Sequence, residues 1–128
     1  MKTHYTVALA MLAGVGLGVA AIQGLHAQAK PVAYVIVETT VTDQDPYMKE
    51  FVPAIVKTVK DAGGKFLASG GKTLTLAGAP PAPRVIVAQF DSLDKVQAWG
   101  TSSTYKDAMA IGQKYGNIRQ FAVEGLTQ

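Results

Sequence analysis

Ala33-Tyr-Val-Ile-Val-Glu-Thr-Thr-Val41 is the stretch that decides the fold. It is rich in β-branched and aromatic residues and ends at a polar turn, so it predicts a first β-strand. Because side chains alternate across a strand, apolar residues fall on both of its sides. Arg84-Val-Ile-Val-Ala-Gln-Phe90 has the same property and predicts another strand. Strands of this kind need cover on both faces of their sheet.

The segment after the first strand predicts a helix. Asp45 is expected as its N-cap and Pro46 as its first residue, where a missing N–H costs nothing. Pro53 removes a hydrogen bond to the carbonyl of Lys49, so a kink or a separate first turn is expected there. Gly63-Gly64 predicts the end of the helix. Apolar residues recur at helical spacing and predict one buried stripe: Met48, Phe51, Val52, Ile55, Val59 and Ala62.

The rest of the chain predicts two further strands and a broken helix around the strand at 84–90. Residues 65–69 and 72–76 are interpreted as two halves of a second strand, bulged at Gly70-Gly71. Ser92 is expected to cap a helix that breaks near residues 100–103 and resumes to the start of a last strand at 118–124. The buried faces predicted for the two helical pieces are Leu93, Val96 and Trp99, and Tyr105, Ala108, Met109 and Gly112.

The resulting β-α-β-β-α-β order predicts an α+β fold of the ferredoxin-like plan, an antiparallel sheet with both helices on one face. Two helices cover only one face of a sheet whose strands are apolar on both. The simplest cover for the other face is the sheet of a second copy. The sequence therefore predicts a homodimer, a dimeric α+β barrel.

The first residues predict a secretory signal peptide over 1–29. One lysine precedes an apolar and glycine-rich run from Val7 to Ile22, and Ala27-Gln28-Ala29 fits the small-residue cleavage pattern, with cleavage after Ala29. The folded domain is then 30–128, and the expected location is periplasmic or secreted. The alternative is an uncleaved membrane anchor, because the apolar run approaches the ~20 residues that span a bilayer.

Composition excludes several chemistries. The chain has no cysteine, and both histidines, His4 and His26, precede the expected cleavage site. A thiol nucleophile, a Ser-His-Asp triad and a histidine-rich zinc site are therefore unavailable, and neither a metal nor a cofactor is expected. The 12 basic and 9 acidic residues are interspersed, which is typical of an ordinary solvated surface. No nucleic-acid partner is expected.

Several segments, taken in order, resemble the bacterial domain-of-unknown-function 1330 family within the dimeric α+β barrel superfamily. They are AYVIVETTVTD, DAGGKFLASGGKTLTLAGAPPAPRVIVAQFDSLDKVQAW, Tyr105 and RQFAVEG. The resemblance covers the whole of 30–128 and implies the fold and the dimer rather than an activity. The chain departs from the family pattern at three positions: Ser69 and Gly112 replace common arginines, and Gly100 replaces an aromatic residue.

Three charged residues are candidates for a site. Glu38 lies on the same side of its strand as Tyr34 and Ile36, where burial would raise its pKa and suit it to acid-base chemistry. Alternatively, it pairs with a basic residue or a backbone group and fixes the dimer register. Arg84 and Arg119 suit a carboxylate or phosphate ligand, because a guanidinium donates two hydrogen bonds at once. Either could instead be an ion-pair partner of Glu124 or Asp91.

Trp99 and Tyr105 flank the predicted helix break and could wall a pocket. Packing against the sheet explains them equally, and Trp99 is interpreted as core. Together with Glu38, Arg84 and Arg119, these residues favour a protein that binds a small, partly apolar or anionic molecule. A cofactor-independent enzyme is the alternative, because the superfamily includes monooxygenases and isomerases; Glu38 would be the base, with Tyr105 or Arg84 as its partner. A purely structural role in the envelope is the third possibility.

Overall fold

The fold was analysed in a computed structural model that describes residues 30–127. The predicted signal peptide and its cleavage site at Ala29 lie outside these residues. Within them, the element order and the antiparallel sheet confirm the α+β ferredoxin-like fold. No helix of the described part is long and apolar enough to cross a membrane.

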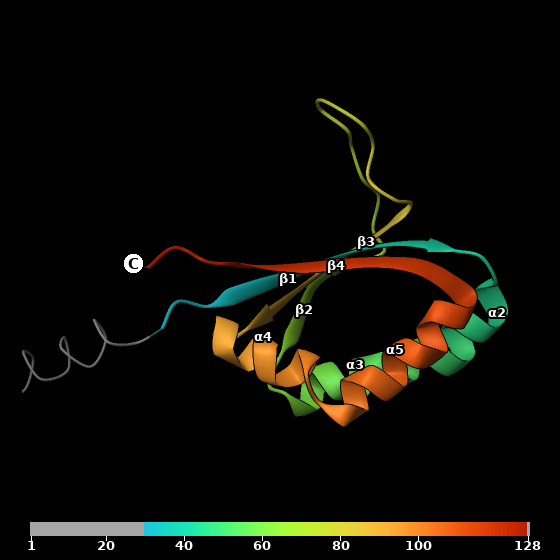
Figure 1. Ribbon diagram of the computed structural model, residues 1–128. Helices are drawn as coiled ribbons and strands as arrows, with labels where there is room; N and C mark the ends of the chain where they lie inside the picture. The colour runs from blue at the N-terminus through green and yellow to red at the C-terminus, as the bar shows by residue number, and fades with distance from the viewer. Residues whose placement is uncertain (1–29, 128) are drawn as a thin grey trace, which may run out of the picture. The chain divides into compact units, whose positions relative to one another are not determined.

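Four strands form one sheet in the order β2-β3-β1-β4, and the helices cover one of its faces (Figure 1). β1 (Ala33–Val41) is central and pairs with β3 (Arg84–Phe90) on one side and β4 (Gly116–Glu124) on the other. β2 (Lys65–Ser69) is an edge strand with a bulge between Phe66 and Ala68. The first and third strands were predicted with these bounds. β4 begins earlier than predicted, at Gly116.

The first helical segment is irregular where the sequence predicts it. α2 (Gln44–Pro46) leads into a π-helical turn, η1 (Tyr47–Phe51), and then α3 (Val52–Asp61). Because Pro53 has no N–H for the carbonyl of Lys49, the helix widens, and the N–H of Val52 donates to the Tyr47 carbonyl.

The start of this segment differs from the prediction. Asp43 rather than Asp45 is the N-cap, and its side chain makes no capping hydrogen bond. The backbone N–H groups of Thr42 and Asp43 instead donate to the carbonyl of Tyr115, at 2.8 and 3.2 Å. Tyr115, the last residue of α5 (Ser103–Tyr115), therefore fixes the backbone where β1 leads into the helix. Met48, predicted on the buried stripe, is 40% exposed.

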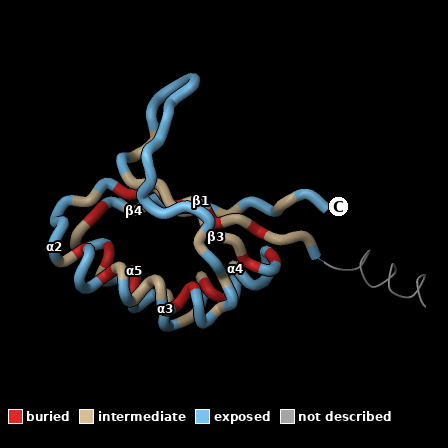
Figure 2. The backbone as a smooth tube through the Cα atoms, turned by 180° about the vertical axis from the view of Figure 1, so that it is seen from behind, coloured by how far each residue is buried: buried red, intermediate tan, exposed pale blue. Residues whose placement is uncertain are grey.

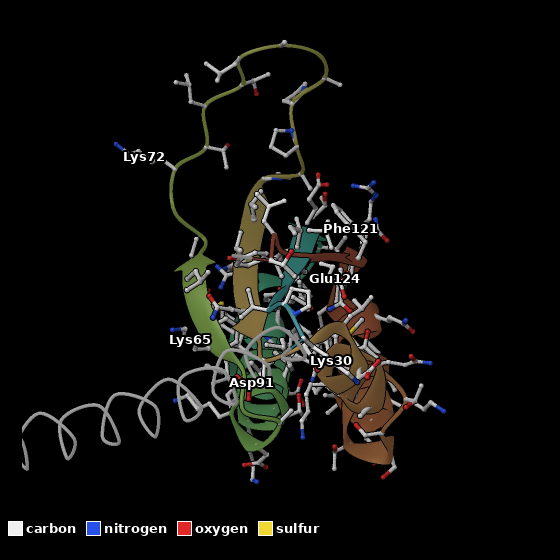
Figure 3. The ribbon with its side chains drawn as sticks, turned by 90° about the vertical axis from the view of Figure 1, so that its left-hand side faces the viewer. Lys30, Lys65, Lys72, Asp91, Phe121 and Glu124 are labelled. Atoms are coloured by element: carbon white, nitrogen blue, oxygen red, sulfur yellow. The ribbon has the colours of Figure 1, made fainter. Side chains whose placement is uncertain are left out.

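Residues 72–76 are not a strand, and the prediction of a two-part second strand was wrong. Gly70 has a φ of +72°, and its N–H makes a last bond, 2.9 Å, to the carbonyl of Val85. β3 begins at Arg84, one residue before Val85, so no residue of β3 remains to pair with residues 72–76. Residues 70–83 form a loop that projects on the side of the sheet away from the helices, and Lys72 lies on it (Figures 1 and 3).

The second helix is broken as predicted. α4 (Leu93–Gly100) is capped by the Ser92 hydroxyl, which accepts a hydrogen bond from the Lys95 N–H at 3.2 Å. α5 (Ser103–Tyr115) follows, capped by Ser102.

Buried residues lie mainly between the helices and the sheet, whereas the 70–83 loop is exposed at nearly every position (Figure 2). Phe90 and Trp99 both belong to the larger of two hydrophobic clusters, and their ring centroids lie 5.1 Å apart. Tyr47, Phe51 and Met109 form a second cluster under the other end of the sheet. Within residues 30–127 no helix or strand covers the opposite face of the sheet, and we call it the open face.

Candidate functional site

The five candidate residues do not form one site, because the structure distributes them over two faces of the sheet and the core. Glu38 and Arg119 are register partners on the open face. Arg84 pairs with Thr39, the next residue of β1, whose side chain lies on the helix-covered face. Trp99 and Tyr105 contact each other beneath the sheet.

Glu38 is fully engaged by neighbours on the open face. Its Oε1 accepts a hydrogen bond from the Ala82 N–H at 3.0 Å, and its Oε2 accepts one from Arg119 Nη1 at 2.5 Å. The Ala82 N–H holds the pKa of Glu38 below its ordinary value despite an opposing effect of burial, and Arg119 lowers it further. The side chain of Glu38 is 19% exposed and that of Arg119 is 70% exposed.

The expectation of a raised pKa at Glu38 was therefore wrong. Two donors stabilise the charged carboxylate more than partial burial destabilises it. A carboxylate held in its ionised form by neighbours is a weak base. The observed contacts match the alternative prediction of a basic residue and a backbone partner.

Trp99 and Tyr105 are packing residues with satisfied polar atoms. Trp99 is 7% exposed, and its Nε1 donates to the Thr58 hydroxyl at 3.0 Å, within a network that ends at the Ile55 carbonyl. The Tyr105 hydroxyl donates a short hydrogen bond to Gln120, and burial raises the pKa of Tyr105. The prediction that Trp99 belongs to the core is confirmed.

Arg84 differs from Arg119 because no carboxylate neutralises it. Among the described residues it forms no ion pair, and its one hydrogen bond is a long one, from Nη2 to the Ser69 hydroxyl at 3.5 Å. Asp91 and Glu124, the proposed partners, lie toward the other end of the sheet, where Ala33 pairs with Phe90 and Glu124.

Two buried polar atoms lack hydrogen-bond partners in the described part of the chain, and they are adjacent. They are the Arg84 Nε and the Thr39 Oγ1. Buried polar groups are normally hydrogen-bonded, because leaving one unsatisfied costs about 1–3 kcal/mol. Two such atoms at directly paired positions mark this place as unusual within the fold.

Both residues line a cavity of about 310 Å³ at the end of the sheet. Its walls come from the end of β1, the start of α2 and η1, and the two bases of the 70–83 loop. The polar lining comes from Thr39, Thr40, Gln44 and Arg84; the other lining residues are Val41, Tyr47, Met48, Gly70 and Pro83. The lining is therefore mixed, and polar groups are at least as prominent in it as apolar ones.

Gly70 gives the Arg84 guanidinium its place. A Cβ at residue 70 would lie 2.6 Å from Nη1 and 3.2 Å from Cζ of Arg84, and the positive φ also disfavours other residues. The turn that ends β2 therefore holds the arginine in the cavity wall.

A larger hollow of about 480 Å³ lies between the two ends of the described chain. Its walls include Val32, Gly125 and Leu126, and Leu126 is 91% exposed. It contains none of the unsatisfied atoms, so it is a weaker candidate. No cluster of His, Cys, Asp or Glu that could hold a metal ion occurs among residues 30–127.

Sequence reasoning found Arg84 but missed Thr39, Gln44 and Tyr47. The alternation of side chains along β1 was a usable signal for Thr39, because it places the Thr39 side chain on the face of the sheet opposite to that of Glu38. Its pairing with Arg84 depends on strand register, which the sequence does not reveal.

The model of a family described as domain of unknown function, DUF1330, matches residues 32–126. The chain belongs to the DUF1330 family. No curated protein matches this DUF1330 chain.

Solved structures share the fold at low sequence identity. A protein of unknown function from Rhodopseudomonas palustris is 13% identical, with a TM-score of 0.53, and the match covers 84% of the DUF1330 chain and 93% of that protein. A dimeric protein of unknown function with a ferredoxin-like fold, from Bacteroides fragilis, is 18% identical with a TM-score of 0.50, over 76% and 99%.

SnoaB, a cofactor-independent oxygenase from Streptomyces nogalater, is 12% identical with a TM-score of 0.50, over 77% and 96% of the two chains. At these identities the similarity shows that the DUF1330 chain shares their fold and nothing about its activity.

Proposed function

We propose that this protein is an exported homodimer that binds a small molecule in the cavity beside Arg84. The observation that carries the binding proposal is the Arg84 guanidinium, which has no ion-pair partner among the described residues and lines a cavity whose lining contains no acidic residue. A bound anion would supply the counter-charge that the described residues do not supply.

The homodimer is supported by the composition of the open face. Register places the half-buried Tyr34, Ile36, Val85 and Val87 there, beside Phe121 and Val123, which are 44% and 50% exposed. A continuous apolar surface of this kind is unusual on a monomer. The similarity in fold to the dimeric Bacteroides fragilis protein supports the same assembly.

Export rests on the sequence of residues 1–29 alone. N-terminal sequencing of the protein recovered from its host's envelope should begin at Lys30. A chain that begins at Met1 would contradict cleavage and favour a membrane anchor.

The enzyme alternative depended on Glu38 as an acid or base. Its two donors and lowered pKa leave that alternative without support, although SnoaB shares the fold and is an oxygenase. Binding is the function that the geometry supports best.

Native mass spectrometry of the protein, expressed from its full-length chain and purified from its own host, tests the proposal. The expected species is a dimer that carries an added small mass. A monomer at micromolar concentration would overturn the assembly, and a dimer without added mass would overturn ligand binding.

A further inference from the structure

We infer that the cavity beside Arg84 recognises a small organic carboxylate. This inference rests on the proposed binding function and adds the chemical class of the ligand. It follows from the charge, the hydrogen-bonding groups and the size of the cavity.

The charge in the cavity wall calls for an anion. Arg84 contributes a permanent positive charge, and the described lining contains no acidic residue. Asp43 and Asp45 flank Gln44 in the sequence, but both are exposed and neither lines the cavity. A neutral ligand would leave the guanidinium without a counter-charge in a partly buried place.

The Arg84 guanidinium fits the two oxygens of a carboxylate, because its planar fork can donate two parallel hydrogen bonds. Among the described residues its only hydrogen bond is the long one from Nη2 to the Ser69 hydroxyl, 3.5 Å. Thr40 and Gln44 supply further hydrogen-bonding groups in the same lining.

A single arginine favours a carboxylate over a phosphate group. A phosphate monoester carries nearly two negative charges at neutral pH and offers more oxygens than these donors satisfy. The described lining supplies no second cation. One guanidinium balances one carboxylate.

The rest of the cavity suits a small body attached to that carboxylate. Val41, Met48 and Pro83 supply apolar contacts in its lining. The volume of about 310 Å³ is at the small end of the range for ligand cavities. Benzoate is therefore a suitable probe, and benzamide is its uncharged counterpart.

Titration of the protein, expressed from its full-length chain, with benzoate, benzamide and inorganic phosphate tests the inference by calorimetry. Benzoate should bind saturably, and benzamide should bind at least about tenfold more weakly because it lacks the charge. Arg84→Gln should weaken benzoate binding by at least about tenfold.

Lys57→Gln is the matched control. It removes the same charge from an exposed ion pair with Asp61 on α3, outside the cavity, and should leave benzoate affinity unchanged. If Arg84→Gln does not fold, the comparison of benzoate with benzamide on the unmodified protein still decides the question.

The inference is overturned if benzoate does not saturate, if benzamide binds equally, or if phosphate binds more tightly than benzoate. Native mass spectrometry separates this failure from failure of the proposed function. If the Arg84→Gln variant still carries a host-derived ligand, the proposed binding function stands and the carboxylate inference is wrong. Absence of both a host-derived ligand and any probe binding would remove both.

Discussion

Arg119 and Arg84 are register partners of neighbouring residues of β1, Glu38 and Thr39, on opposite faces of the sheet. Arg119 is exposed, yet it has a carboxylate partner and a ring, Phe121, whose centroid is 5.0 Å from its guanidinium carbon. Arg84 is less exposed, yet the described residues supply it with only one hydroxyl, at 3.5 Å. The comparison teaches that the covered face, where an unsatisfied group costs most, is where the groups suited to a ligand are found.

The largest effect is expected from the core beneath the covered face. Phe90→Ala removes a ring that is 1% exposed and packs against Trp99, so it should lower the free energy of unfolding by about 3–5 kcal/mol. Urea denaturation measures this value. Leu74→Ala on the loop, where the side chain is 83% exposed, should change it by less than about 0.5 kcal/mol. Equal losses of unfolding free energy in Phe90→Ala and Leu74→Ala would contradict the assignment of Phe90 to the core and Leu74 to an exposed loop.

The next effect concerns the open face. Phe121→Asp puts a charge into the apolar surface proposed to join two copies, so the dimer dissociation constant should rise by at least about tenfold. Analytical ultracentrifugation over a concentration series measures it. Leu93→Asp is the control, because Leu93 has a similar exposure, 40% against 44%, but lies on α4 on the helix side. An unchanged dimer in Phe121→Asp would place the interface elsewhere.

A smaller effect of opposite sign is expected at Thr39. Thr39→Val removes a buried hydroxyl that has no partner, so the ligand-free protein should gain about 1 kcal/mol of stability. Thermal denaturation without ligand measures the gain.

The same substitution at Thr58 is its control. The Thr58 hydroxyl accepts from Trp99 and donates to the Ile55 carbonyl, so Thr58→Val should cost about 1–3 kcal/mol. Destabilisation by Thr39→Val would mean that its hydroxyl has a partner in solution.

The smallest effect is the pH dependence contributed by Glu38. Since folding lowers the pKa of Glu38 below 4.5, its stabilising contribution is complete above that pH and is lost as the pH falls through the lowered pKa. Glu38→Gln should therefore lose less stability than the wild type between pH 5 and the acid limit, in a series of melting temperatures. A wild-type slope in Glu38→Gln would contradict the assigned pKa direction.

Much of the fold follows from sequence because its signals are local. Alternation defined β1 and β3, Pro53 marked the irregular helical turn, and Ser92 marked a helix start. The error at residues 72–76 has a non-local cause: their Thr-Leu alternation is that of a strand, but β3 offers no residues to pair with them.

The site was less predictable because it depends on register. Glu38 lies within β1 and Arg84 begins β3, and only the pairing of β1 with β3 shows that their side chains lie on opposite faces of the sheet. Thr39 carries no signal by itself, since threonine is an ordinary strand residue. Its importance arises from burial beside Arg84 without a partner.

The segment Ala82-Pro83 at the base of the projecting loop belongs to both faces. The Ala82 N–H holds Glu38 on the open face, whereas Pro83 lines the cavity beside Arg84. Because the two residues are consecutive, a ligand that displaced Pro83 would also move the donor that orients Glu38. Occupancy of the cavity and association through the open face would then be thermodynamically linked, and each would change the affinity of the other by the same factor.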